Sequence, residues 1–282
     1  MFRLWVCSAL KISDVLVTKL STGISSPKTI ERFVHQYLDH PPKPKPTTKP
    51  REIYLKIDST YFGRWGCCLV YKTGKEIIFW DFDLRENYLR YMQNLTKLRE
   101  LGYIIKGVTS DKHSGIVEAI RSLFPDIPHQ HCVVHLRRYC EMLLTKHPET
   151  EAGQDLLILV SHLTEIKDPY HRDIWIKWLK RFGDRYQNFI NQKSHANDGT
   201  KHWWYTHKNL RKAYRSLVHS LDHMFLYLDH QGLESNTNGL ETEFSHLKEK
   251  LGRHRGLKRH RKISFVGWYW HFKSNKKPQQ NR

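Results

Sequence analysis

Two aspartates stand in apolar, β-rich segments, where a charged side chain is costly. Asp58 lies in the middle of one such segment and Asp111 closes another. A carboxylate among apolar neighbours needs a compensating partner, and a salt bridge to a nearby lysine or arginine is the alternative for either aspartate alone. If the two segments are neighbouring strands, the carboxylates converge at one sheet edge and favour Mg²⁺ or Mn²⁺. Two such ions could activate a water or a 3′-hydroxyl on one side of a phosphodiester and stabilise the leaving oxygen on the other.

A Cys-x-x-His pair, Cys132 and His135, is the second group with chemical potential. A structural zinc site needs four ligands, and no second pair of this kind stands nearby. Residues 127–136 are predicted to form a strand, where side chains three apart point to opposite faces. We therefore expect a structural or DNA-positioning role rather than a metal site. The only close additional candidates are His113, His129 and His131.

The periodicity of the chain predicts an α/β fold that holds these residues. Three β-rich segments joined by short turns predict an antiparallel meander, and two helices then alternate with two further strands. The predicted strands are 53–62, 66–74, 76–84, 103–111 and 127–136, and the predicted helices are 87–102 and 114–124.

The N-terminal part is predicted to be a separate helical piece. Residues 12–38 favour two helices around a turn at Gly23, with Ser26 as N-cap and Pro27 in the first helical position. This arrangement fits a helix-turn-helix, and a helical hairpin without DNA contact fits equally well. Residues 40–51 are rich in proline and lysine and predict an extended linker.

From residue 137 to about 228 the sequence is helical and interrupts the α/β pattern. One helix carries aromatic residues at three- and four-residue steps, which is typical of a buried face. The adjacent Trp203 and Trp204 could stack on a flipped base, although nothing in the sequence selects that role. The aromatic residues of the predicted face are Trp175, Trp178, Phe182, Tyr186 and Phe189.

The charge of the chain indicates a polyanionic partner. The chain has 47 Lys+Arg against 28 Asp+Glu, a net charge of +19, and residues 248–282 contribute +11 of it, from 12 Lys+Arg and one acidic residue. We expect this stretch to contact DNA phosphates. No apolar run approaches the ~20 residues of a membrane span, and five unevenly spaced cysteines favour reduced thiols, so we expect a cytoplasmic protein. The expected DNA-binding residues are Arg253, Arg255, Lys258, Arg259, Arg261 and Lys262.

The motifs around these residues form a recognisable series. Residues 110–138 and 235–257 resemble the bacterial insertion-sequence transposases related to the eukaryotic Mutator-like superfamily, and the resemblance covers about residues 54–257. The composite, in order and with similar spacing, is far more specific than any single motif. The matching residues are Asp111, Phe124, Pro125, Gln130, Cys132, His135, Arg138, Thr237, Asn238 and Glu241.

This resemblance implies a DDE transposase with an RNase H-like core. It implies a catalytic site of Asp58, Asp111 and Glu241 that binds two Mg²⁺ or Mn²⁺ ions, and an all-helical insertion in a mixed sheet. The implied partners are double-stranded DNA, both terminal inverted repeats and target, and a second copy of the chain, because two ends are cut; the implied location is the bacterial nucleoid. The expected parts are 1–39 (helical), 40–51 (linker), 52–140 (core), 141–228 (insertion), 229–265 (core completion) and 266–282 (basic tail).

Three glutamates lie close together near the end of the implied core. On a helix, Glu243 projects about 200° away from Glu241, and Glu234 is expected to precede the helix. Glu241 is therefore the expected catalytic glutamate. The alternatives to an active transposase are a decayed, inactive DNA-binding copy and a cellular nuclease of RNase H type, against which the 129 residues between Asp111 and Glu241 argue.

Overall fold

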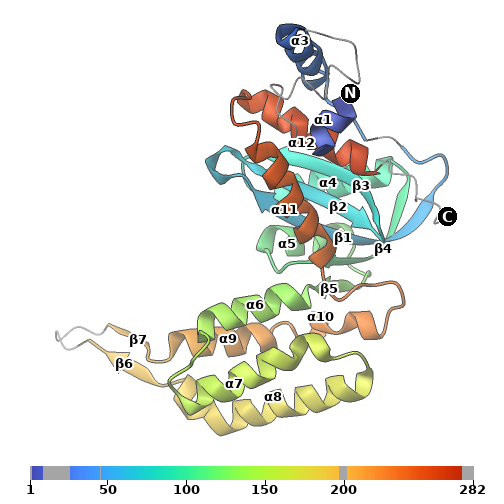
Figure 1. Ribbon diagram of the computed structural model, residues 1–282. Helices are drawn as coiled ribbons and strands as arrows, with labels where there is room; N and C mark the ends of the chain where they lie inside the picture. The colour runs from blue at the N-terminus through green and yellow to red at the C-terminus, as the bar shows by residue number, and fades with distance from the viewer. Residues whose placement is uncertain (1, 9–25, 45, 197–201, 275–282) are drawn as a thin grey trace, which may run out of the picture. The chain divides into compact units, whose positions relative to one another are not determined.

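The computed structural model describes residues 2–8, 26–44, 46–196 and 202–274 (Figure 1). The chain forms two compact units. The sheet unit consists of Met1–Lys106, Ser114–Pro125 and Asn238–Arg282, and the helical unit consists of Gly107–His113 and Asp126–Thr237.

A five-stranded mixed sheet has the order β3-β2-β1-β4-β5. Strands β1, β2 and β3 pair antiparallel, so the predicted meander is confirmed, and β4 and β5 pair parallel. Gly74, with a φ of 51°, forms the tight turn between β2 and β3, a conformation that glycine adopts without strain. The strands are β1 (Arg51–Tyr61), β2 (Cys67–Thr73), β3 (Glu76–Asp83), β4 (Tyr103–Ser110) and β5 (His129–His131).

Helices cover the sheet unit. The apolar faces of four helices form one core with Cys68 and Val70 of β2. A further helix is bound to β3, where Arg90 Nη2 and Asn94 Nδ2 donate to Asp81 at 2.6 and 2.9 Å. The helices of the shared core are α1 (Phe2–Ser8), α3 (Pro27–Leu38), α11 (Asn238–Gly252) and α12 (Arg259–Ser274), and the helices beyond them are α4 (Tyr88–Glu100) and α5 (Ser114–Leu123).

The predicted cap of one helix is confirmed, and a second helix has an asparagine cap. Ser26 is the N-cap of α3 and a proline occupies its first turn, as predicted. Asn87 caps α4 by accepting a hydrogen bond from the amide of Arg90 at 2.9 Å. The first helix expected for a helix-turn-helix, within residues 12–20, lies outside the described residues.

The helical unit contains a β-hairpin as well as helices, so the expectation of an all-helical insertion over 141–228 is wrong (Figure 1). Strand β7 consists of three consecutive aromatic residues, Trp203–Tyr205, and such a run favours a strand. The elements are α6 (Val133–Leu144), α7 (Glu151–His162), η2 (Leu163–Glu165), α8 (Pro169–Ile190), β6 (Lys193–His195), β7 (Trp203–Tyr205), α9 (Lys208–Val218), α10 (Leu221–Met224) and η3 (Leu226–Leu228).

The aromatic face predicted on α8 is mostly buried. Trp175 and Phe182 belong to the core of the helical unit, and Tyr186 and Phe189 pack against that core. Trp178, by contrast, is 47% exposed, because Leu179 occupies the core position one residue later. The prediction is therefore wrong for Trp178 alone.

Two predicted boundaries are wrong. The strand expected over 127–136 ends at His131, and α6 begins at Val133. The apolar residues from Val133 onward therefore form the first turn of a helix instead of the end of a strand. The basic tail expected over 266–282 begins as part of α12, which runs from Arg259 to Ser274. Val266, Tyr269 and Trp270 of that helix are buried in the sheet unit, so burial of aromatic surface outweighs the local charge.

Candidate active site

Asp58 is a buried carboxylate in the centre of β1. Its side chain is 8% exposed, and Oδ1 accepts a hydrogen bond from the amide of Ser59 at 2.9 Å. Asp58 is in register with Val70 of β2, and directly opposite residues place their side chains on the same face of a sheet. Val70 belongs to the core formed with α11, so Asp58 points to the face that α11 covers.

Helix α11 begins on this same face of the sheet unit. A Cβ placed on Gly239 would lie 3.0 Å from the Nζ of Lys72, which is in register with Lys56, two residues before Asp58. Glu241 lies in the first turn of α11, as predicted. The sheet unit therefore brings Asp58 and Glu241 to one face of its sheet.

The neighbouring glutamates have other roles, in agreement with the sequence analysis. The carboxylate of Glu243 accepts hydrogen bonds from the hydroxyl of Tyr269 at 3.0 Å and pairs with Nζ of Lys273 at 2.7 Å. Burial raises the pKa of Glu243, but the hydrogen bond and positive charge of Lys273 and the hydrogen bond from Tyr269 lower it by more. The pKa of Glu243 therefore lies below its usual value. Glu234 precedes α11, and its carbonyl accepts a hydrogen bond from Thr109 Oγ1 at 2.7 Å.

Asp111 directly follows β4. Strand β4 is next to β1 in the sheet, as the sequence analysis assumed for the two segments that carry the aspartates. Its Oδ1 accepts a hydrogen bond from the amide of His113 at 3.2 Å. Asp111 lines a cavity of about 460 Å³ in the helical unit, together with Cys132 and His135. The structure thus brings these three predicted residues together within one unit. The other residues lining this cavity are Lys112, His113, His131, Leu136, Tyr139 and Ser220.

Cys132 and His135 lie side by side, because α6 begins between them. Cys132 is the N-cap of α6, so His135 falls in the first turn of that helix and not on the opposite face of a strand. Both contact Thr237: the Thr237 amide and hydroxyl donate to Sγ of Cys132 at 3.4 and 3.6 Å, and the hydroxyl lies 3.5 Å from His135 Nδ1. Burial raises the pKa of the Cys132 thiol, but hydrogen bonding to His135 and its charge bring the pKa below its usual value.

Two buried histidines, His129 and His131, lie at or beside the Asp111 cavity, and the exposed His223 contacts both. The ring of His131 stacks on that of His223, with centroids 4.6 Å apart, and lies edge-on to that of His129 at 5.2 Å. Nε2 of His129 is 2.8 Å from Ser110 Oγ, whereas both ring nitrogens of His131 are buried without a hydrogen-bond partner. Burial lowers the pKa of each of His129 and His131 to about 3, so both rings are neutral.

The expected DNA-binding residues differ in how their charges are used. Arg261 forms a bidentate pair with Asp39, with Nε and Nη2 donating at 2.9 and 3.0 Å. Arg253 pairs with Glu249 at 3.0 Å, Arg259 donates to the carbonyl of Trp65 at 2.9 Å, and Arg255 donates to the carbonyl of Gly252 at 3.3 Å. Lys258 is exposed and Lys262 is half-buried. The charge of Arg261 is thus used within the fold, which the sequence analysis did not foresee.

The donor atoms of the predicted site suit a hard divalent cation. Three carboxylates offer only oxygen ligands, which Mg²⁺ and Mn²⁺ prefer. Asp58 and Glu241 belong to the sheet unit, and Asp111 to the helical unit. Within the residues that the structure describes, no group of three or more His, Cys, Asp or Glu side chains is arranged to hold a metal ion.

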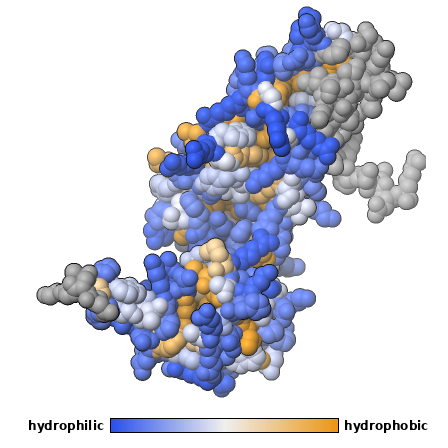
Figure 2. Space-filling view, turned by 60° about the vertical axis from the view of Figure 1, so that its left-hand side comes forward, coloured by the Kyte–Doolittle hydropathy of each residue, from blue (hydrophilic) through white to orange (hydrophobic). Residues whose placement is uncertain are grey.

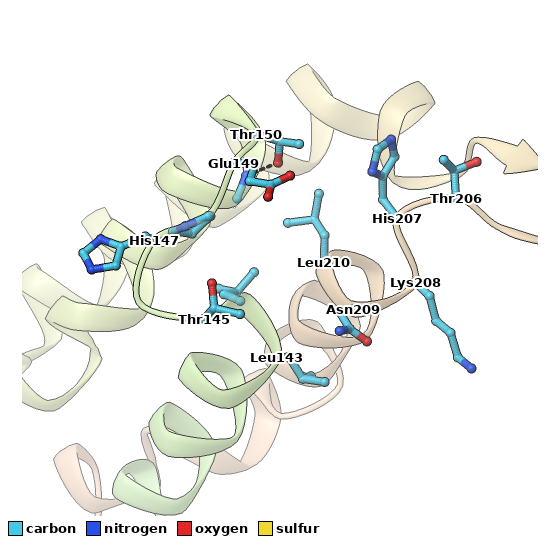
Figure 3. A pocket seen from close by; sticks show the side chains of 13 residues that line it. Leu143, Thr145, His147, Glu149, Thr150, Thr206, His207, Lys208, Asn209 and Leu210 are labelled. Atoms are coloured by element: carbon cyan, nitrogen blue, oxygen red, sulfur yellow. Dashed lines mark hydrogen bonds between the residues drawn. The ribbon is translucent and has the colours of Figure 1, made fainter.

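A second cavity of about 440 Å³ lies between the end of α6 and the starts of α7 and α9 (Figure 3). Leu143, Thr145 and Leu210 lie around its centre, whereas the side chains of His147 and Lys208 point away from it (Figure 3). It contains none of the predicted site residues. Because the cavity beside Asp111 contains three of those residues, it is the better candidate.

Thr237 and His131 are the residues of this site that the sequence analysis did not identify by role. Thr237 appeared there only as part of a motif, and His131 only as a possible additional zinc ligand. A signal was present for Thr237, since a threonine just before a predicted helix is a common partner for buried polar groups.

Comparison with known proteins identifies the family of this chain. The family described as "Transposase, Mutator family" matches residues 68–223, just over half of the chain. The match includes Asp111, Cys132 and His135, and it ends before Glu241. A search of curated proteins found no match. In the described segments no helix has the length and apolarity to cross a membrane. The matched range, together with its motif residues, shows that the chain belongs to the Mutator family of transposases.

Proposed function

We propose that this transposase cuts the ends of a DNA element by metal-assisted hydrolysis and joins the freed 3′-hydroxyl to target DNA, using an RNase H-like core. Asp58, Asp111 and Glu241 are the catalytic residues of this proposal. The observation that carries it is the burial of the Asp58 carboxylate in the centre of β1, on the face that α11 covers. A charge in that position is retained at a cost in stability, which a catalytic role explains.

The sheet order supports this proposal. The order β3-β2-β1-β4-β5 places β1 beside β4, so Asp58 and the residue that follows β4 belong to adjacent strands. The first turn of α11 brings Glu241 to the same sheet face as Asp58. These observations support the proposal of a three-carboxylate site on an RNase H-like core.

The residues divide the work as follows. Asp58 and Asp111 would hold the two Mg²⁺ or Mn²⁺ ions, and Glu241 would complete the second. The ions supply activation of the attacking oxygen and stabilisation of the leaving oxygen. Burial shields Asp58 from bulk water and strengthens its interaction with a cation. The contact of Ser59 with the Asp58 carboxylate keeps this side chain in one orientation.

DNA is the proposed partner because of the charge of the chain and its family. The net charge is +19, and exposed cations such as Lys258 follow α11 directly. Each phosphate contact adds salt-dependent affinity. Since an element has two ends, we propose that the active form on DNA contains at least two copies of the chain.

The test of this proposal begins with the DNA around the coding sequence. We expect terminal inverted repeats to flank it, and a plasmid carrying these ends should be cut and joined by purified protein when Mg²⁺ is added. Cleavage without joining, on DNA without the repeats, would favour a nuclease. Binding to the repeats without any cleavage by the wild-type chain would favour a decayed copy.

A further inference from the structure

The hairpin β6–β7 projects from the helices of the helical unit and carries exposed tryptophans (Figure 1). Trp203 and Trp204 are 42% and 45% exposed. Full burial of a large aromatic side chain stabilises a fold by about 1.5–3 kcal/mol. Trp203 and Trp204 are only partly buried, so each contributes only part of this stabilisation. Paired exposed tryptophans on one short hairpin therefore call for a partner.

The base of this hairpin is fixed, so the exposure is a property of the fold. The amide of Thr206 donates to the carbonyl of Gln192 at 3.0 Å, and Ser194 Oγ lies 2.7 Å from Thr206 Oγ1. The rings of Phe189 and His207 stack with centroids 3.7 Å apart, which connects the end of α8 to the start of α9. A two-stranded hairpin is marginal in isolation, and these contacts supply its support.

The two sides of β7 have different surroundings. Trp203 and Tyr205 alternate with Trp204, so they lie on the opposite side of the strand. Lys193 Nζ lies 3.9 Å from the centre of the Trp203 ring, and the Arg211 guanidinium lies 3.9 Å from that of Tyr205. One side of the hairpin thus holds two cations against aromatic rings.

The other side of the hairpin leaves an indole open. Trp204 is in register with Ser194, and a serine side chain is too small to cover an indole ring. The His202 ring approaches Trp204 at 5.8 Å and a tilted angle. In Figure 2 the described residues of the hairpin are mostly pale to blue, and orange residues lie on the helices beside it. A flat partner that stacks on one ring fits this side better than a hydrophobic protein surface.

The local charge selects an anionic partner. Residues 192–215 contain six Lys+Arg and one Asp. Cations interleaved with exposed aromatic rings are the arrangement with which proteins bind unpaired nucleic-acid strands, because the cations meet phosphates and the rings stack on bases. A duplex, whose bases are already stacked, would use only the cations.

We propose that the hairpin β6–β7 binds unpaired DNA, with a base stacked on Trp204 on one side of the hairpin and the phosphates of adjoining nucleotides held by Lys193 and Arg211 on the other. This inference rests on the DNA-binding part of the proposed function and not on its catalytic part. The helical unit would then have a role separate from catalysis, because its hairpin would hold bases that leave the duplex near a cut end.

The experiment measures binding of the full chain to fluorescent oligothymidine and to a blunt duplex by anisotropy. We expect Trp204→Ala to weaken binding to oligothymidine by roughly 5- to 150-fold, the range of one stacked base, and to leave duplex binding unchanged. Lys193→Gln should weaken binding and lower the slope of log affinity against log salt by about 0.7. The matched control is Trp178→Ala, which removes another exposed tryptophan of the same unit and should change neither affinity.

Two results would overturn the inference. One is a Trp204→Ala protein that binds oligothymidine as tightly as Trp178→Ala. The other is an equal loss for both forms of DNA, which would assign the hairpin to the duplex backbone. If Trp204→Ala does not fold, Trp204→Phe should retain most of the affinity, while Trp204→Leu, checked by circular dichroism, should lose it. Binding to oligothymidine requires no cleavage, so a failure of the catalytic proposal would leave this measurement unaffected and remains distinguishable.

Discussion

The backbone amide of Thr237 donates a hydrogen bond to Sγ of Cys132 at 3.4 Å, although 105 residues separate them in the sequence. A second hydrogen bond joins the same two segments: the amide of Val133 donates to the carbonyl of Ser235 at 3.0 Å. Thr237 directly precedes α11, the helix of Glu241. The Cys-x-x-His pair therefore contacts the residue that directly precedes this helix.

We predict that serine replaces Cys132 better than alanine does. Cys132 is 2% exposed, and Cys132→Ala removes the sulfur to which both the amide and the hydroxyl of Thr237 donate, at a cost of about 1–3 kcal/mol. Cys132→Ser keeps an acceptor and should cost less. Urea unfolding measures both free energies.

Cys140 is the matched control for this pair of variants. It lies in the apolar core of the helical unit, and burial raises its pKa to about 12. Its Sγ donates to the carbonyl of Ala213 at 3.8 Å and does not serve as the acceptor of a backbone amide, so Cys140→Ala leaves no donor unpaired and the advantage of serine over alanine should be smaller there. An equal advantage of serine at both positions would contradict a specific acceptor role for Cys132.

We predict that purified protein contains no stoichiometric zinc. Cys132 and His135 both contact Thr237 and supply two ligands, whereas a structural zinc site needs four. Elemental analysis tests this directly. About one zinc per chain, lost in Cys132→Ser, would show that the pair is a metal site.

The buried histidines predict a loss of stability in acid. The pKa of His129 and of His131 falls from 6.5 to about 3 in the fold, so the unfolded chain binds protons that the folded chain does not. Their contribution is complete above about pH 6.5 and is lost as the pH falls toward 3, at about 1.4 kcal/mol per pH unit for each proton. Urea unfolding across this range measures the slope.

His131→Leu separates this effect from general acid unfolding. Both ring nitrogens of His131 lack partners, so the variant should be at least as stable as the wild type near neutral pH. The slope of its unfolding free energy against pH should be smaller by about one proton. His129→Leu removes the contact with Ser110 and should lose stability at neutral pH. An unchanged slope in both variants would be incompatible with neutral buried rings.

We predict that Lys258 and Arg261 affect different properties. Lys258→Gln should lower the salt slope of duplex binding by about 0.9 for a lost phosphate contact and leave stability unchanged. Arg261→Gln breaks the bidentate pair with Asp39, so it should mainly reduce stability. Deletion of residues 258–282 is a poor test, because it removes α12 and its buried Trp270. Equal salt slopes for the wild type and Lys258→Gln would place Lys258 outside the DNA interface.

The sequence predicted those elements whose signals are local. The meander of β1, β2 and β3 followed from alternation and a Thr-Gly turn, and the start of α3 followed from Ser26 and a proline. The start of α6 was missed because a short apolar run is compatible with either a strand or a helix. The core role of α12 was missed because its charges masked aromatic residues such as Phe265, which is fully buried.

The contacts of the candidate site could be predicted only in part. Residue types and spacing singled out Asp58 and Cys132, but the pairing of Cys132 with Thr237 depends on how distant segments pack. The burial of His131 and the pairing of Arg261 with Asp39 depend on tertiary packing in the same way. Local pattern contains no information on such contacts, which is why these roles emerged only from the structure.

Glu241 and Glu243 offer the most direct test of the central claim, because they differ by two positions on one helix. Strand cleavage and joining are measured on DNA carrying the ends of the element, with Mg²⁺, for Glu241→Gln and Glu243→Gln, alongside Asp58→Asn and Asp111→Asn. We predict that Glu241→Gln and both aspartate variants bind this DNA but neither cut nor join it. Glu243→Gln, which alters only the contacts with Tyr269 and Lys273, should remain active. An active Glu241→Gln protein would contradict the assignment of the catalytic site.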